Sequence, residues 1–205
     1  MSVSFLGRPL RGLMLVAAMA GCSALSGPTD RVNLLGGRFV VAAPAGFCVD
    51  PKSRRDNGSG SFVLFGDCAV IGGAAPARTP MRQAVLSATI GPETPGPIET
   101  TFPGFDRFFH SAAGRAMLAR SGSAGDVDIL QVRKAGSVML LKIRDRSTPR
   151  DPLVSQVYWR AIVDLGGRIT ALSVLPLRAA PMTDAAQIRL LEDFVASIRA
   201  ANGWT

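Results

Sequence analysis

The chain has 205 residues, with 23 Lys and Arg against 15 Asp and Glu and a formal net charge of +8. This length fits one domain that buries a substantial core. Beyond the first thirty residues the arginines are scattered from Arg31 to Arg199, with no run of five basic residues. Nucleic-acid binding is therefore not expected. The charge can attract anionic lipids, lipopolysaccharide or acidic polymers, or simply reflect an arginine-rich proteome.

The first residues have the pattern of an export signal. Arg8 and Arg11 precede an apolar segment, 13–20, of the length found in secretory signal peptides. A transmembrane helix needs about 20 apolar residues, so this segment is predicted to be removed. Cleavage after Ala20 by ordinary signal peptidase would leave Gly21 as the first residue. Cleavage one residue later would make Cys22 the N-terminus.

The sequence Met19-Ala20-Gly21-Cys22 resembles the lipobox of bacterial lipoproteins, with Met where Leu is usual. The resemblance implies that the Cys22 thiol carries diacylglycerol and becomes the mature N-terminus. It also implies an anchor on the periplasmic side of the cell envelope, and Ser23 in the second mature position favours the outer membrane. Two or three acyl chains would make release from the bilayer slow.

The chain has three cysteines, Cys22, Cys48 and Cys68. In an oxidising compartment an odd cysteine needs an explanation. If Cys22 carries lipid, Cys48 and Cys68 are predicted to form one disulfide, which a loop-entropy treatment values at about 3 kcal/mol. If Cys22 carries none, the alternative is a soluble periplasmic protein with an incidental free thiol.

The chain divides into three predicted parts, which are a signal peptide (1–21), the lipidated cysteine with a tether (22–36) and a single α+β domain (37–205). In the first part of the domain, β-propensity predicts strands at 37–44, 47–48, 61–68 and 85–91. Residues 51–60, PKSRRDNGSG, indicate a loop between the two cysteines. Residues 92–104, which contain four prolines, are expected to be an extended crossing segment.

The second part of the domain is predicted to contain two helices and two hairpins. Apolar residues at helical spacing predict one amphipathic helix over 105–118. Hairpins are expected over 127–145, turning at 134–136, and over 154–176, turning at 164–167. A last helix is expected to start at Thr183 and to end at a left-handed cap. The predicted buried stripes are Phe105, Phe108, Phe109, Ala112, Ala113, Ala116 and Met117 on the first helix, and Ile188, Leu191, Phe194, Val195 and Ile198 on the last, which closes at Asn202-Gly203.

This order of elements predicts an antiparallel β-sheet with two main amphipathic helices packed on it, either one on each face or both on one face. The stretch FVVAAPAGF, the paired hairpins and the closing FVASIR resemble the PsbP-like fold, an α/β/α sandwich. That resemblance implies binding rather than catalysis. The chain also resembles small envelope lipoproteins of bacteria, which implies no particular activity.

Catalytic signatures are not recognisable in the sequence. His110 is the single histidine, and Asp106 lies one helical turn before it, where the two side chains can pair. We expect a surface histidine there rather than a catalytic dyad, because no Gly-x-Ser-x-Gly elbow occurs. Asp126 and Asp128, expected to share a face of one strand, form at most a weak cation site. No catalytic residue, cofactor or metal site is predicted.

Lys52, Arg54 and Arg55 are the candidate partner contact, because arginine forks suit phosphate or carboxylate groups. The ordinary alternative is a solvated loop. The predicted function is a membrane-anchored periplasmic lipoprotein, a non-catalytic module that binds an envelope protein or an anionic glycan or lipid. The alternatives are a soluble periplasmic ligand-binding domain and, third, an envelope hydrolase that uses scattered carboxylates or His110.

Overall fold

The computed structural model describes Met1 and residues 27–57, 60–74, 82–147 and 153–204. The strands in chain order are β1 (Arg31–Leu34), β2 (Phe39–Ala42), β3 (Phe47–Val49), β4 (Arg55–Asp56), β5 (Ser61–Asp67), β6 (Ala84–Glu93), β7 (Val127–Ala135), β8 (Val138–Asp145), β9 (Val157–Leu165) and β10 (Arg168–Pro176). The helices are α1 (Cys68–Ile71), α2 (Phe102–His110), α3 (Ala112–Leu118) and α4 (Asp184–Asn202), with 3₁₀ turns η1 (Ile98–Thr101) and η2 (Ala124–Asp126).

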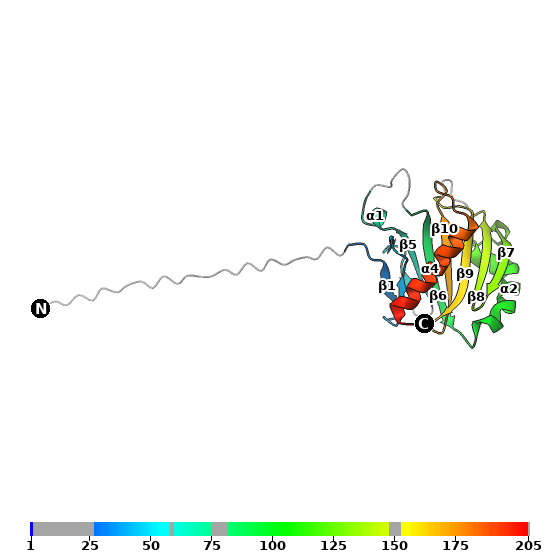
Figure 1. The fold of residues 1–205 in the computed structure, drawn as a ribbon, viewed down its shortest axis with the longest axis horizontal. Helices are drawn as coiled ribbons and strands as arrows, with labels where there is room; N and C mark the ends of the chain where they lie inside the picture. The colour runs from blue at the N-terminus through cyan, green and yellow to red at the C-terminus, as the bar shows by residue number, and fades with distance from the viewer. Residues whose placement is uncertain (2–26, 58–59, 75–81, 148–152, 205) are drawn as a thin grey trace.

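The main sheet is antiparallel throughout and runs in the order β3-β5-β6-β10-β9-β8-β7, with β4 also paired to β5. Strands β1 and β2 form a separate two-stranded ribbon that packs beside α4 on one face of this sheet. The pair α2 and α3 covers the opposite face near β7 and β8 (Figure 1). The predicted α+β class, with an antiparallel sheet and amphipathic helices packed on it, is confirmed.

Both predicted hairpins are confirmed. The β9–β10 turn consists of Gly166 and Gly167, which have φ of 59° and 74°. Two consecutive left-handed residues match the right-handed twist of the strands that they connect. The β7–β8 turn contains Gly136 at φ 53°.

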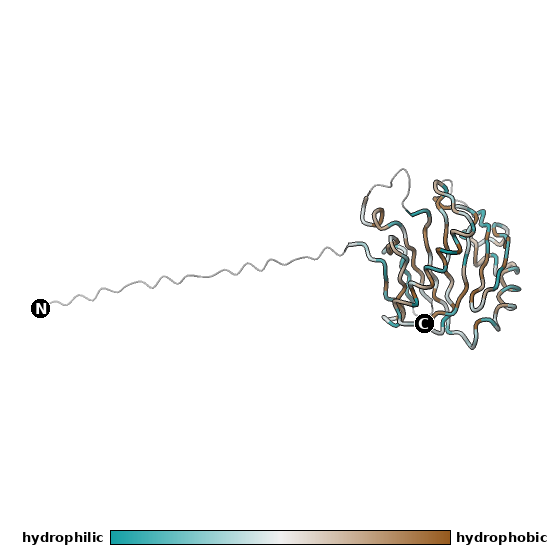
Figure 2. The backbone as a smooth tube through the Cα atoms, in the orientation of Figure 1, coloured by the Kyte–Doolittle hydropathy of each residue, from teal (hydrophilic) through white to brown (hydrophobic). Residues whose placement is uncertain are grey.

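The core has one apolar cluster on each face of the sheet, and hydrophobic segments follow its strands in Figure 2. On β9, Trp159 and Ala161 face α4, while Tyr158 and Ile162 face α2 and α3. Because a strand points successive side chains to opposite faces, a central strand covered on both sides is apolar almost throughout. This explains the weak alternation of hydrophobic residues in the hairpin sequences.

The predicted single helix over 105–118 was wrong. Ser111 adopts an extended conformation, with φ −73° and ψ 163°, and separates α2 from α3. Its hydroxyl donates to the carbonyl of Phe108 and accepts the amide N–H of Gly114, so it ends one helix and caps the next. The break rotates α3, which changes the predicted stripe. The buried residues of the two helices are Phe102, Phe109, Gly114 and Leu118, whereas Ala112, Ala113 and Met117 are exposed.

The segment 92–104 is not extended throughout, because it contains η1 and the start of α2. Pro103 stands in the first turn of α2, where a missing backbone donor costs little.

Helix α4 is confirmed in detail. The Thr183 hydroxyl accepts the amide N–H of Ala186 at 3.2 Å, and Gly203 has the left-handed φ of 69°. The predicted stripe lies against the sheet, with Ile188 half-buried and the other four members buried. Gln187, which the sequence did not single out, is also buried, and its side-chain oxygen accepts the backbone N–H of Trp159 at 3.2 Å.

The described fold begins before residue 37, where the domain was predicted to start. Arg31–Leu34, expected in the tether, forms β1 and pairs with β2, and the carbonyl of Thr29 accepts the amide N–H of Val49 at 2.8 Å. The segment 51–60, predicted as a loop, contains the short strand β4. Cys22 and the predicted signal cleavage sites lie outside the described residues.

Candidate functional site

The predicted contact residues Lys52, Arg54 and Arg55 are all exposed, but Arg54 is engaged in the fold. Its guanidinium donates to the carbonyl of Asn33 in β1 at 3.0 Å and lies 3.6 Å from the carboxylate of Asp56. Arg54 therefore helps to join β4 to the β1–β2 ribbon. The structure does not gather the three cations into a single pocket, because Lys52 and Arg55 line none of the cavities described below.

Asp56 is the centre of this junction. Its carboxylate accepts the amide N–H of Leu35 at 3.1 Å and the hydroxyl of Ser61 at 2.7 Å. The hydrogen bond from Ser61 is the largest cause that lowers the pKa of Asp56, with smaller contributions from Leu35 and Arg54. This cluster is a structural junction between β1, β4 and β5.

The predicted disulfide is confirmed. Cys48 in β3 is bonded to Cys68 at the start of α1. The bond joins β3, at the edge of the sheet, to the short helix α1 that follows β5.

His110 lies on the surface, as predicted. Its Nδ1 atom is 2.9 Å from the carbonyl oxygen of Asp106 and 3.2 Å from the carboxylate of the same residue. Lys134 Nζ lies 3.5 Å from the other carboxylate oxygen. The three side chains, with Pro103 and Arg107, line a surface depression of about 380 Å³ that contains no serine or cysteine. This arrangement is an exposed charge cluster at the end of α2.

The expectation that Asp126 and Asp128 share one strand face was wrong. Asp126 ends the 3₁₀ turn η2, and only Asp128 belongs to β7. Asp126 accepts the hydroxyl of Ser121 at 2.7 Å, whereas Asp128 pairs with Arg146, whose hydrogen bond is the largest cause of its lowered pKa. Within the described ranges, no group of three or more His, Cys, Asp and Glu side chains is placed to hold a metal ion.

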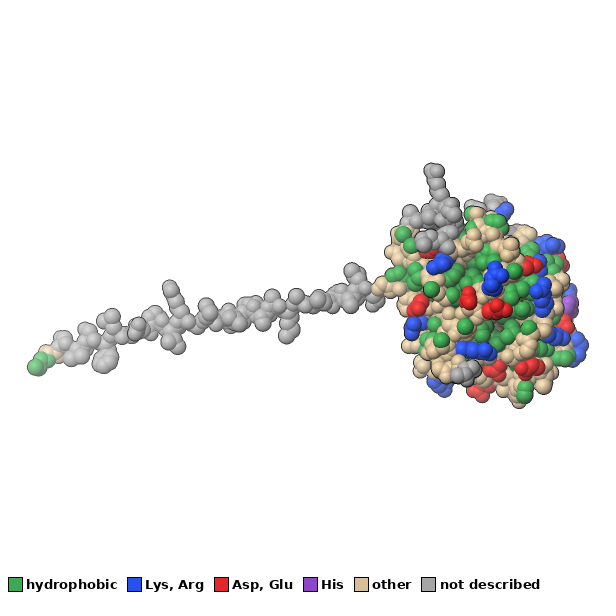
Figure 3. All heavy atoms as spheres, viewed as in Figure 1, with side chains coloured by type: hydrophobic (Ala, Val, Ile, Leu, Met, Phe, Trp, Pro, Cys, Tyr) green, Lys and Arg blue, Asp and Glu red, His purple; other side chains and the backbone are tan. Residues whose placement is uncertain are grey.

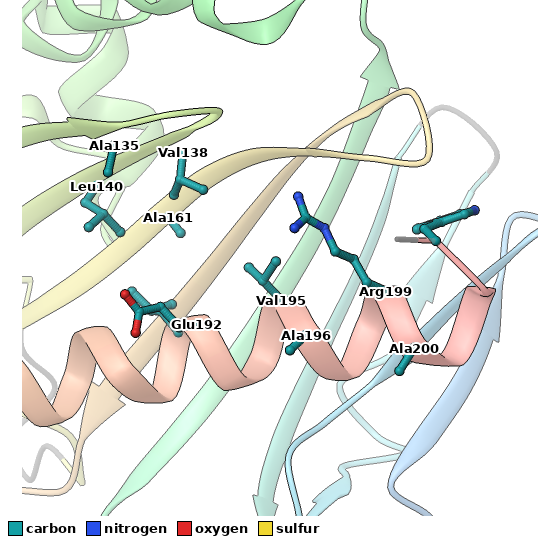
Figure 4. Close-up of a pocket in the computed structure, with 11 residues that line it drawn as sticks. Ala135, Val138, Leu140, Ala161, Glu192, Val195, Ala196, Arg199 and Ala200 are labelled. Atoms are coloured by element: carbon teal, nitrogen blue, oxygen red, sulfur yellow. The ribbon is translucent and has the colours of Figure 1, made fainter.

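A further concave site is a groove between α4 and the β7–β8 hairpin. Its volume is about 500 Å³. Figure 4 shows it as the space between the upper side of α4 and the strands opposite, and Figure 3 shows hydrophobic side chains interspersed with charged ones on this face. The lining residues are Ala135, Val138, Leu140, Ala161, Leu191, Glu192, Val195, Ala196, Arg199, Ala200 and Trp204.

The floor of the groove follows from the sheet register. Ala161 pairs with Leu140, and Leu140 pairs with Arg133, so these three residues form one row across β9, β8 and β7. Alanine side chains leave space above the sheet where larger residues would fill it. Trp204 closes one end, where its ring packs edge-on against Phe39 at 5.2 Å between ring centres.

Charged groups surround the apolar floor. Glu192 and Arg199 are the charged lining residues, and Figure 4 shows Arg199 pointing from α4 over the sheet. Neither side chain makes an ion pair within the described part of the chain. The guanidinium of Arg133 lies 5.1 Å from the ring centre of Trp159, a cation–π contact.

At the other end of α4, Lys142 and Asp184 form an ion pair with a distance of 2.6 Å. The hydrogen bond from Lys142 is the largest cause that lowers the pKa of Asp184. Arg133 contributes to the same lowering at longer range. Glu192 and Arg199 remain as the charged lining residues of the groove, with Arg133 beside it.

The sequence did not predict this groove. The one local signal was a pair of alanines, Ala196 and Ala200, on the side of α4 away from the predicted stripe. Whether these alanines border a groove depends on where α4 lies on the sheet, which is a property of the tertiary structure.

No helix in the described ranges is both long enough and apolar enough to cross a membrane. No family model matches the chain, and no curated protein matches it. Among solved structures, the chain is similar to the Saccharomyces cerevisiae Ran-binding protein Mog1p, with 12% identity and a TM-score of 0.41 over 84% of this chain and 95% of that one. A mutant of Mog1 gives 12% identity and a TM-score of 0.40, covering 82% and 93%. Similarities this weak carry no argument about the present chain.

Proposed function

We propose that this chain is a membrane-anchored periplasmic lipoprotein whose single domain is a non-catalytic module that binds a partner in the cell envelope. The observation that carries the proposal is the bond between Cys48 and Cys68. Disulfides persist in oxidising compartments and are rare in the cytosol. The bond uses two of the three cysteines and leaves Cys22, within its lipobox-like sequence, as the one for lipid.

The start of the fold supports a short connection to the membrane. Thr29 is already hydrogen-bonded to β3, and only seven peptide units separate it from Cys22. A fully extended segment of this length spans about 25 Å. An anchor at Cys22 would therefore keep the domain close to the bilayer surface.

The groove beside α4 supports binding as the role of the domain. Ligand sites are mostly apolar with a few polar groups, and have volumes of about 300–1,000 Å³. The groove falls in this range, with two charged side chains in an otherwise apolar lining. We place the partner contact there, because Arg54 of the contact predicted from the sequence already holds β4 to β1.

Radiolabelled palmitate and globomycin test the anchor. The wild-type protein is expected to incorporate palmitate and to accumulate as a diacylated precursor with globomycin, whereas Cys22→Ser is expected to do neither. Non-reducing peptide mapping is expected to recover Cys48 linked to Cys68. A purified protein that begins at Gly21 with an unmodified thiol at Cys22 would contradict the proposal and favour the soluble periplasmic ligand-binding alternative.

His110→Ala separates the binding module from the envelope hydrolase. In a strain that lacks the gene, this variant is expected to restore any phenotype fully, because His110 is a surface side chain next to Asp106. Failure of a stably folded His110→Ala protein to complement would favour the hydrolase.

A further inference from the structure

The open strip of sheet beside α4 has the width of one helix. On this face α4 packs over β9 and β10, while β8 and β7 continue beyond it to the edge of the sheet. Neighbouring strands are about 4.8 Å apart, so β8 and β7 together make a strip about 10 Å wide. This is the diameter of a helix with its side chains, about 10–12 Å.

The strip also has a defined length. The residues of α4 that border the groove run from Leu191 to Ala200, and Trp204 closes the end beyond them. At about 1.5 Å per residue, this border corresponds to a helix of about three turns. Ala196 and Ala200 on α4, with Ala135 and Ala161 on the sheet, allow the close axial approach of about 8–10 Å that packed helices adopt.

The charges favour an acidic occupant. Arg199 lines the groove, and Arg133 lies next to it in the row of Leu140 and Ala161. Within the described part of the chain neither guanidinium makes an ion pair, although Arg133 acts on Asp184 at longer range, and Glu192 is the one acidic lining residue. Lys142 is already neutralised by Asp184. Acidic side chains on a ligand could therefore pair with Arg199 in the groove and with Arg133 beside it, whereas basic side chains would meet like charge at both.

We propose that the groove binds an amphipathic helix of a partner protein, about three turns long, with an apolar stripe at i, i+3, i+4 and i+7 and acidic residues beside that stripe. The helix would lie next to α4 over β7 and β8 and complete the helical layer on this face. The inference deepens the proposed function, because it rests on the domain being a binding module and names the class of partner.

Two labelled helical peptides of about 14 residues test the proposal by fluorescence anisotropy. Both carry the same Leu stripe, and one has Glu and the other Lys beside it. They are titrated against the full processed chain in phosphatidylcholine nanodiscs, with empty nanodiscs as the blank. The acidic peptide is expected to bind about tenfold more tightly than the basic one.

Matched variants locate the contact. Arg133→Glu combined with Arg199→Glu is expected to reverse the preference between the two peptides. Arg189→Glu is the control, because Arg189 is an exposed arginine of the same helix that does not line the groove, and it is expected to leave the preference unchanged. Ala196→Trp is expected to weaken both peptides by filling the groove, with an unchanged thermal melt.

Equal binding of the two peptides, or an equal effect of Arg189→Glu and the groove variants, would overturn the proposal. A concentration-dependent dimer that Ala196→Trp abolishes would assign the groove to a second copy of the chain and also overturn it. Binding of oleate that Ala196→Trp blocks, with no binding of either peptide, would also overturn the proposal. If the peptides failed to bind while Cys22 was still labelled with palmitate, only the helix-binding inference would be rejected. If the acidic peptide bound while Cys22 was not labelled, the anchor would be rejected and the helix-binding inference would be supported.

Discussion

The two helical layers of this domain are built in different ways. Helix α4 is one uninterrupted helix of 19 residues, with a Thr183 cap at one end and the left-handed Gly203 at the other. On the opposite face, α2 and α3 have nine and seven residues and meet at the extended Ser111. Helices this short are marginal in isolation. Helix α4 is therefore specified largely by its own sequence, whereas α2 and α3 depend on what they pack against.

The α2–α3 layer is held by close backbone contacts. A Cβ atom on Gly114 would lie 1.9 Å from the carbonyl oxygen of Phe108. The backbone N–H and the guanidinium of Arg120, just after α3, both donate to the fully buried carboxylate of Asp145 in β8. These two points are where the layer should be easiest to break.

The largest expected effect is that of Gly114→Ala, which has to push α3 away from α2. We expect a loss of about 3 kcal/mol in the free energy of unfolding, at the upper end for overpacking, measured by urea denaturation. Gly104→Ala is the matched control in α2, since a Cβ there meets nothing within 4 Å. It should raise stability slightly, because Ala is the better helix former. Equal effects of the two substitutions would contradict the picture of a contact-limited junction.

Asp145→Ala should cost about 2 kcal/mol, because it removes a buried acceptor and leaves its donors without a partner. The donors are Arg120 and the backbone N–H of Ser147, which lies 2.8 Å from the carboxylate. Urea denaturation measures the loss. Asp128→Ala is the control, because its ion pair with Arg146 is exposed, and surface pairs contribute little. A greater loss in Asp128→Ala would reverse our ranking of the two carboxylates.

On the α4 side, Asn202→Ala should cost about 1 kcal/mol. The side-chain amide of Asn202 accepts the backbone N–H of Val40 at 2.9 Å and donates to its carbonyl at 2.7 Å. Hydrogen exchange is expected to accelerate at Val40 in β2 while the β9–β10 amides keep their protection. Uniform acceleration across the sheet would mean that Asn202 supports the whole fold rather than the ribbon.

Acid should weaken the contact between Arg120 and Asp145 that holds the α2–α3 layer. Burial raises the pKa of Asp145, but the hydrogen bonds from Ser147 and Arg120 outweigh it, so the net pKa is lowered. A lowered folded pKa gives stability that is present above the unfolded value of about 3.9 and is lost as the pH falls through the folded value. The urea concentration at the midpoint of unfolding, measured from pH 7 downward, is expected to decrease once the pH is below about 4. Asp145→Asn should make this decrease smaller. If the midpoint of Asp145→Asn depended on pH as strongly as that of the wild type, the pH dependence would come from other carboxylates. Asp56 and Asp184 are candidates, because their pKa values are also lowered.

The same contrast explains what the sequence could predict. The turns at Gly136 and Gly166-Gly167 and the caps of α4 are local signals, and all were predicted. The break at Ser111 has a local cause, the competing hydroxyl, but the helical period around it was the stronger pattern. Strands β1 and β4 have four and two residues, and they exist because β2 and β5 lie beside them.

For the candidate sites, counting cysteines was enough to predict the disulfide, since only two remained after Cys22 was assigned to lipid. The groove could not be predicted in this way. Ala135 belongs to β7, Leu140 to β8 and Val195 to α4, and the space between them depends on how far α4 extends across the sheet. No pattern within a single segment encodes that distance.

The contact between Asn202 and Val40 has a consequence for biogenesis. The two residues are 162 positions apart, so β2 leaves the ribosome long before the amide that holds it has been synthesised. The β1–β2 ribbon must wait for the end of translation to find its final support.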